Sequence, residues 1–307
     1  MLRGCRRCHS ETINTMTTSA TDPASDFRRV FEDQGFVIMK GVVDRDVVRG
    51  VREAVEKLTE ATIAGLIDEG AAQDPCDGEP FETRLLKVYR QLDGPRPMDY
   101  RNNLHLEGMY PLFFHPDILG FVESILGPEI RLYPNYTVRP KLPDDEATLV
   151  LWHQDAGYTA SGGSDKDLGQ REASAALLRM VNVWSPLVPA RVENGCMQFV
   201  PGSHKLGLMP HFEKQFYLEI VPEKLKPHLT DAVSIELDPG DIVLFSNLLF
   251  HCGLPNPSDG IRWSCDWRYQ DATQSTAREH VGHIARSRKN PSSAVQSAEE
   301  WARLTFV

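Results

Sequence analysis

Two patterns of apolar residues divide this chain near residue 129. Before that point, apolar residues recur at steps of three or four, as at Val47, Val51 and Val55, which is typical of an amphipathic helix with one buried face. Asp44 stands where the N-cap of the longest such segment is expected, and Gly70 follows its end. The pattern predicts a strand at residues 36–39, a loop at 71–80, and helices over residues 26–34, 44–69, 81–91 and 115–126.

Beyond residue 129 the chain changes to short runs in which apolar and polar residues alternate, as in half-buried strands. Turn residues separate nearly all of these runs, and no long-period repeat indicates a propeller or a solenoid. A series of short strands after a helical first third predicts a mainly β fold, a sandwich or jelly roll with flanking α-helices. The predicted strands cover residues 130–138, 147–153, 177–188, 196–200, 233–237, 241–245, 248–254 and 261–269.

We expect one folded domain with an outer part at each end. The domain covers residues 26–271 and includes the helical first third. Residues 1–25 are rich in Ser and Thr and are predicted to be a disordered extension. Residues 272–307 are polar and are predicted to form a surface tail with a short helix at 293–304.

Composition places the 307-residue chain among ordinary globular proteins, with 41% hydrophobic and 25% charged residues. The net charge is −10 and no run of five or six basic residues occurs, so a nucleic acid is not expected as a partner. The longest apolar stretches, such as residues 242–250, are far shorter than the ~20 residues of a membrane-spanning helix. We therefore expect a water-soluble protein that binds neither nucleic acid nor membrane. The oligomeric state is left open.

Six cysteines are scattered along the chain without a signal peptide, so reduced thiols in the cytoplasm or another reducing compartment are expected. Cys5, Cys8 and His9 match the spacing of a covalent haem attachment site. That attachment requires export, and residues 1–25 contain no apolar run that could act as an export signal. Haem is therefore not expected.

A candidate metal site begins at His153 and Asp155, at the end of a predicted strand. Residues two apart on a strand point to the same face, so the imidazole and the carboxylate converge on one point. A His-x-Asp triplet alone also fits a surface ion pair or a turn. A second histidine from a distant strand would complete the facial triad of non-haem Fe(II) oxygenases. His251 ends an apolar strand, where a buried imidazole is either hydrogen-bonded or bound to metal.

Arg262 is the second candidate feature. It lies eleven residues after His251, across one loop, so it can occupy the neighbouring antiparallel strand and reach the same cavity. A buried arginine needs an anionic partner, and no acidic residue nearby in the sequence is an obvious one. A ligand carboxylate fits the planar guanidinium, and Ser264, on the same face, can add a hydrogen bond. The pair predicts a binding site for a dicarboxylic co-substrate.

Taken in order, several motifs resemble the phytanoyl-CoA dioxygenase family of Fe(II)- and 2-oxoglutarate-dependent oxygenases. The resemblance implies a double-stranded β-helix, a jelly roll of the cupin kind. It implies His153, Asp155 and His251 as iron ligands, and Arg262, assisted by Ser264, as the partner of 2-oxoglutarate. Asn135, in the strand before the first ligand, is a further candidate contact. The motifs are Trp152-His153-Gln154-Asp155, Glu193-Asn194-Gly195-Cys196-Met197, Val200-Pro201-Gly202-Ser203-His204-Lys205, Pro239-Gly240-Asp241, His251 and Arg262.

The resemblance implies a dioxygenase that uses Fe(II), 2-oxoglutarate and O2 and releases succinate and CO2. Because Asp155 retains the carboxylate ligand, hydroxylation of an unactivated C–H bond is favoured over halogenation. Desaturation, ring closure and peroxide formation stay open. A zinc-dependent cupin-like enzyme and a non-catalytic barrel are the alternatives. Arg262 argues against zinc, because zinc hydrolysis needs no 2-oxoglutarate site.

The substrate is expected to be a small organic metabolite, with a natural-product intermediate as one candidate. Specificity is expected in segments 71–110 and 156–176, and the polar loop at 161–167 is positioned to cover the site. The predicted pocket-lining residues are Tyr158, Met109 and Phe113. Plain core roles are expected for Trp184 and Gln198, and structural or surface roles for His204, His105, His115, His211, His228, His280 and His283.

Overall fold

The computed structural model describes residues 23–94, 96–97, 100–101, 103–161, 176–214 and 217–306. Most of the predicted N-terminal extension, with its cysteines, lies outside these ranges. The predicted polar loop lies outside them from residue 162 onward. In the part of the chain that is described, no helix combines the length and the apolarity needed to cross a bilayer.

The helices of the first third lie where their sequence periodicity predicts them. Val51, Val55 and Ile63 form the buried face of α2, and Asp44 is its N-cap residue. His115 precedes α5, and Gly127 follows it with a φ of 94°, a backbone conformation that favours glycine. The α-helices are α1 (Pro23–Gln34), α2 (Arg45–Asp68), α3 (Arg84–Tyr89), α4 (Tyr110–Phe113), α5 (Pro116–Leu126), α6 (Asp155–Ser161), α8 (Pro222–Leu225) and α9 (Ala298–Arg303).

The strands form a large antiparallel sheet and two small ones. The large sheet has seven strands in the order β1-β9-β4-β11-β2-β12, with β3 also paired to β11. A three-stranded sheet has the order β10-β5-β8, and β6 pairs with β7. The strands are β1 (Phe36–Met39), β2 (Glu129–Leu132), β3 (Thr137–Lys141), β4 (Met180–Pro186), β5 (Met197–Phe199), β6 (His211–Glu213), β7 (Leu218–Ile220), β8 (Val233–Ile235), β9 (Ile242–Ser246), β10 (His251–Gly253), β11 (Arg262–Asp271) and β12 (His283–Ser287).

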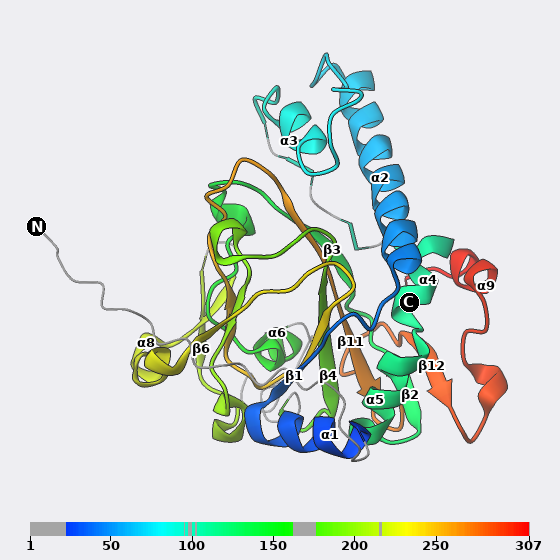
Figure 1. The fold of residues 1–307 in the computed structure, drawn as a ribbon, viewed down its shortest axis with the longest axis vertical. Coiled ribbons are helices and arrows are strands. Elements are labelled where there is room, and N and C mark those ends of the chain that lie inside the picture. Colours follow the sequence, from blue (N-terminus) through cyan, green and yellow to red (C-terminus); the bar gives the residue numbers. More distant parts are fainter. Residues whose placement is uncertain are drawn as a thin grey trace, which may run out of the picture.

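Two apolar cores lie on opposite faces of the large sheet. One fills the space between the large and the three-stranded sheet, where Phe36, Phe245 and Phe199 pack together. The other lies between the large sheet and the helices, and α2, α4, α5 and α9 contribute to it. Figure 1 shows these helices on one side of the large sheet and the strands of the small sheets on the other. This arrangement confirms the predicted jelly roll with flanking helices.

The predicted strand at 147–153 is wrong. Residues 146–148 form a 3-10 turn instead, in which the Asp145 carboxylate accepts a hydrogen bond from the Thr148 backbone N–H at 3.2 Å. In that stretch, only His153 makes a strand-like pairing, an isolated bridge to His251. The predicted strand at 130–138 is interrupted at Pro134, so β2 and β3 are separate.

Residues after 271 contain the predicted short helix within 293–304, which is α9, but they do not form a surface tail. Strand β12 pairs with β2 and extends the large sheet. Helix α9 then packs on the helical core through Trp301, whose side chain is 0% exposed and whose Nε1 donates to the Leu104 carbonyl at 3.0 Å. The sequence pattern did not reveal that α9 packs on the core, because its neighbouring residues are polar and a single buried tryptophan produces no periodicity.

Trp301→Ala should therefore lower the free energy of unfolding by about 3–5 kcal/mol, because it removes a fully buried ring and leaves a cavity. Urea denaturation measures this change. Arg303→Ala, on an exposed position of the same helix, is the matched control and should change the stability by less than about 0.5 kcal/mol. Equal stabilities of the two variants would contradict the assignment of α9 to the core.

Candidate active site

A cavity of about 320 Å³ lies between the large sheet and the three-stranded sheet. Strands β4 and β11 of the large sheet contribute Asn182, Trp184 and Arg262 to its wall. Strand β10, from the opposite side, contributes His251. The cavity thus lies within the jelly roll, where both walls are regular strands.

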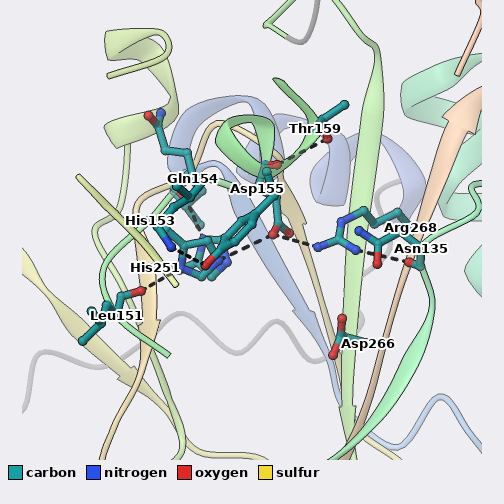
Figure 2. Close-up of polar contacts among 12 residues, drawn as sticks. Asn135, Leu151, His153, Gln154, Asp155, Thr159, His251, Asp266 and Arg268 are labelled. Atoms are coloured by element: carbon teal, nitrogen blue, oxygen red, sulfur yellow. Dashed lines mark hydrogen bonds and ion pairs between the residues drawn. The ribbon is translucent and has the colours of Figure 1, made fainter. Parts of the chain in front are cut away.

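His153, Asp155 and His251 come together on this cavity. One ligand atom of each lies within 4.8 Å of the others, and all three side chains are buried. His153 and His251 lie opposite each other because their backbones exchange two hydrogen bonds, with N···O distances of 2.9 and 3.1 Å. Figure 2 shows the two imidazoles beside the Asp155 carboxylate. Among the described residues, this is the single cluster of three or more metal-ligating side chains.

The sequence predicted that the side chains of His153 and Asp155 converge, but for a structural reason that is partly wrong. Asp155 does not continue a strand from His153, because it opens helix α6. The turn into that helix brings the Asp155 carboxylate to 3.5 Å from Nε2 of His153. The convergence of the two side chains is therefore confirmed, and its cause is a strand-to-helix turn.

The protonation states of the cluster suit a metal ion. Nδ1 of His153 and Nδ1 of His251 each lie against a backbone carbonyl, those of Leu151 at 2.7 Å and Leu249 at 2.9 Å. These carbonyls favour a proton on Nδ1 and leave each Nε2 as a lone-pair donor. Burial, and then the neighbouring His153, lower the pKa of His251 to about 3, so this imidazole is neutral at physiological pH.

Arg268 is a site residue that the sequence analysis missed. Its guanidinium donates to Oδ1 of Asp155 at 2.7 Å, and both groups are buried (Figure 2). Burial alone would raise the pKa of Asp155. The adjacent Arg268 guanidinium outweighs burial and holds that pKa well below its ordinary value. The carboxylate is thus ionised and oriented, as a metal ligand requires.

The periodicity of β11 could have revealed Arg268. Polar residues occupy every second position of this strand, Arg262, Ser264, Asp266 and Arg268, and large apolar residues or cysteine lie between them. Residues two apart share a face, so the face that carries Arg262 must also carry Arg268. The apolar residues of the other face pack in the helical core.

Arg262 lies buried in the cavity wall, 5% exposed, without an ionic partner from the described residues. It donates to the Ser264 hydroxyl, and its guanidinium lies 5.2 Å from the ring centre of Trp184. Its Nε is buried and has no hydrogen-bond partner in the described part of the chain. Asp266, the nearest acid on the strand, pairs with Arg139. Burial lowers the pKa of Arg262 to about 10, which leaves it charged.

Lys141 faces Arg262 across the β3–β11 pairing and was also missed. Its Nζ donates to the carbonyls of Thr148 at 3.1 Å and Gly253 at 3.4 Å, and the residue is 3% exposed. Burial, followed by the Arg262 charge, lowers the pKa of Lys141 to about 7. A second basic group therefore lies next to Arg262, although Lys141 is not among the residues that line the cavity.

The other predicted site residues divide between the cavity and the core. Asn135 and Tyr158 line the cavity. Trp184 lines it as well, so the plain core role expected for this residue is wrong. Met109 and Phe113 do not, since both are fully buried in the helical core, and that part of the prediction is wrong. Gln198 donates to the Ser234 hydroxyl at 3.1 Å.

The remaining histidines have structural contacts, as predicted, where the structure shows their partners. His204 lies 3.1 Å from the Glu32 carbonyl, and His105 lies 3.3 Å from His283. His211 accepts a hydrogen bond from the Gln154 backbone at 3.1 Å, which helps to fix the segment between two residues of the cluster.

The chain is similar to a known family and to characterised enzymes over most of its length. A family model described as phytanoyl-CoA dioxygenase matches residues 31–264. The 1-deoxypentalenic acid 11-beta-hydroxylase of Streptomyces arenae is 25% identical over 91% of this chain and 93% of its own length. The human peroxisomal phytanoyl-CoA dioxygenase is 24% identical over 83% of this chain and 72% of its own length.

Solved structures share the fold at low sequence identity. EctD from S. alaskensis, crystallised with 2-oxoglutarate and 5-hydroxyectoine, superposes with a TM-score of 0.58 at 16% identity over 87% of this chain and 81% of its own. The apo form of the non-haem monooxygenase ThoJ superposes with a TM-score of 0.56 at 21% identity over 85% and 84%. At such low sequence identity, these superpositions are evidence for the fold alone.

The pKa of Lys141 predicts how stability depends on pH in the protein without iron and 2-oxoglutarate. Because the folded-state pKa of about 7 lies below the ordinary value of 10.5, the unfolded chain binds more protons between these values. Burying the charged Lys141 therefore lowers the free energy of unfolding by its full amount below pH 7, and this penalty declines as pH rises towards 10.5.

Lys141→Met removes the titrating group, so the stability of this variant relative to the parent should be highest near pH 6 and fall towards pH 10. Chemical denaturation at several pH values measures this difference. A difference independent of pH would contradict the assignment.

Proposed function

The chain belongs to the phytanoyl-CoA dioxygenase family and is an Fe(II)- and 2-oxoglutarate-dependent oxygenase, and on this basis we propose that His153, Asp155 and His251 bind its iron. The observation that carries the proposal is their convergence on one cavity. Two imidazoles whose Nδ1 atoms face backbone carbonyls, together with one ionised carboxylate, form a donor set that suits Fe(II) and leaves coordination positions open. Family membership favours iron over the zinc alternative.

Arg262 is the proposed partner of the distal carboxylate of 2-oxoglutarate. A buried guanidinium without an ionic partner among the described residues is costly, and a bidentate carboxylate would satisfy it. Ser264 already orients the guanidinium through a hydrogen bond. Lys141 adds positive charge at this end, so a doubly negative co-substrate fits better than a neutral one.

The proposed reaction is hydroxylation of a small organic metabolite at an unactivated C–H bond. Iron with 2-oxoglutarate and O2 supplies the oxidising power, and succinate and CO2 are the co-products. The chain's own part is to bind and orient the substrate and to exclude water, for which a cavity between two sheets is suited. A Streptomyces arenae relative is named as a hydroxylase of 1-deoxypentalenic acid, which favours a natural-product intermediate as substrate here.

A reducing compartment is proposed as the location of the protein. Cys76, Cys196, Cys252 and Cys265 are all free thiols in the structure. Burial raises the pKa of Cys252 to about 12, which keeps the thiol beside the cavity protonated. Unpaired thiols are typical of intracellular proteins.

Asp155→Ala should abolish substrate oxidation and weaken Fe(II) binding at least 100-fold, because a ligand is lost. Anaerobic titration with Fe(II), followed by metal analysis after gel filtration, measures the affinity. Asp155→Asn keeps an acceptor for Arg268 and controls for damage to the fold. Asp266→Asn, in the same cavity but outside the cluster, should retain iron. Parental iron affinity in Asp155→Ala would refute the proposed ligand set.

Arg262→Met should raise the KM for 2-oxoglutarate by about 30-fold or more, because a lost buried charge pair is worth ~2–5 kcal/mol. The KM is measured from succinate formation at saturating Fe(II). Ser264→Ala removes only the supporting hydrogen bond and should have a smaller effect in the same direction. Superimposable saturation curves for Arg262→Met and the parent would exclude this role.

A further inference from the structure

Among the described residues that line the active-site cavity, positive side chains outnumber negative ones. Burial in the wall of a narrow cavity strengthens the effect of such an excess, because the low local dielectric screens it poorly. Fe(II) and 2-oxoglutarate have opposite double charges, so their binding together leaves the excess unchanged. The charged Arg and Asp residues among the described cavity-lining residues are Arg101, Arg139, Arg262, Arg268 and Arg278 against Asp155 and Asp266.

Both carboxylates already have arginine partners. Asp155 pairs with Arg268, and Asp266 pairs with Arg139. Arg278 makes no ion pair with any described carboxylate, and its buried Nε has no hydrogen-bond partner among the residues that the structure describes. Its guanidinium instead lies 5.7 Å from the ring centre of Tyr133. This arginine therefore presents an unbalanced charge to the cavity.

Arg278 lies at the end of the cavity away from Arg262. The backbone N–H of Tyr133, the residue beneath Arg278, donates to the carbonyl of Arg268 at 2.9 Å. Arg268 is six residues after Arg262 on an extended strand, a separation of about 20 Å along the backbone. A five-carbon diacid that runs from Arg262 to the cluster of His153, Asp155 and His251 ends there, so it leaves Arg278 for another ligand.

Arg101 adds to the positive charge near Arg278. Its guanidinium donates to Oδ1 of Asn135 at 2.9 Å. Burial lowers the pKa of Arg101, and the nearby charges of Arg139, Arg268 and Arg278 lower it further, while the Asp266 carboxylate raises it. These guanidinium groups are thus close enough to repel one another, and an anion placed among them would relieve that repulsion.

The turn that carries Arg278 is held in place by its own hydrogen bonds. Thr276 is buried, and its hydroxyl donates to the carbonyl of His280 at 2.8 Å. Ala277 has a φ of 54°, in the left-handed region that non-glycine residues rarely adopt. A turn fixed in this way holds the following guanidinium at a defined place, which lowers the entropic cost of binding an anion there.

We propose that Arg278, with Arg101 beside it, binds a carboxylate of the substrate, so the substrate is a small organic acid. This proposal rests on the proposed function, since it assigns Arg262 to 2-oxoglutarate. A planar guanidinium binds a carboxylate through two parallel hydrogen bonds, and the buried Nε edge of Arg278 is available for them. The cavity of about 320 Å³ must also hold 2-oxoglutarate, which favours a small acid.

The test compares acids with their neutral amides on the Fe(II)- and 2-oxoglutarate-loaded protein without oxygen. The probes are cyclohexanecarboxylate, benzoate and octanoate, each with its primary amide, and cyclohexyl phosphate. Isothermal titration calorimetry at saturating 2-oxoglutarate keeps the Arg262 end occupied. At least one acid should bind tenfold or more tightly than its amide. Arg278→Gln should reduce that preference to twofold or less, and Arg278→Lys should retain part of it.

Arg303→Gln, which removes an exposed arginine on α9, is the matched control and should keep the full preference. The carboxylate site is overturned if no acid binds more tightly than its amide, or if Arg278→Gln keeps the parental preference. Tighter binding of cyclohexyl phosphate than of cyclohexanecarboxylate would overturn the carboxylate assignment in favour of a phosphate. The visible absorption band of the iron–2-oxoglutarate complex is recorded first. Its absence in the parent would overturn the proposed function, whereas a normal band without acid preference would overturn the carboxylate site alone.

Discussion

The alternation of side chains along β11 is the constraint on which the site depends. Every second residue of this strand points into the helical core, and Trp263 and Trp267 anchor it there with no exposed surface. The residues between them must then point into the space between the two sheets. Arg262 and Arg268 are buried for this reason, and a shift of the strand by one residue would exchange the core face for the charged face. Core packing therefore fixes the positions of the charged groups.

A second constraint joins two distant parts of the chain. His153 and His251 are nearly a hundred residues apart, yet two backbone hydrogen bonds hold them side by side. The distance between the imidazoles thus depends on the backbone and little on side-chain freedom. Asp155 is added by the turn that starts α6, and Arg268 holds its carboxylate from the opposite sheet. Both sheets contribute to the cluster, so its geometry depends on the complete jelly roll.

Sequence patterns predicted the parts of this design that depend on local order. The periodicity of α2 is a local signal, and that helix forms. The apolar run before His251 does not form the predicted strand, because residues 248–250 lie in a turn and β10 begins at His251. The pairing of Asp155 with Arg268 could not be predicted in the same way, because it depends on how β11 lies relative to α6. Strand β12 escaped prediction because it joins the sheet through pairing with β2, and its own residues are only partly apolar.

The cost of leaving positive charge without a partner would provide selectivity. Arg262, which is buried, and Arg278, whose Nε is buried, would each lack an ionic partner among the described residues if a neutral molecule filled the cavity. A site built around groups that need a partner rejects ligands lacking that partner far more strongly than an apolar pocket rejects a misfit. The same groups weaken the empty protein, and ligands that bind only the folded state recover that stability. The two proposed anions, at Arg262 and at Arg278, would thus recover stability that the empty cavity lacks.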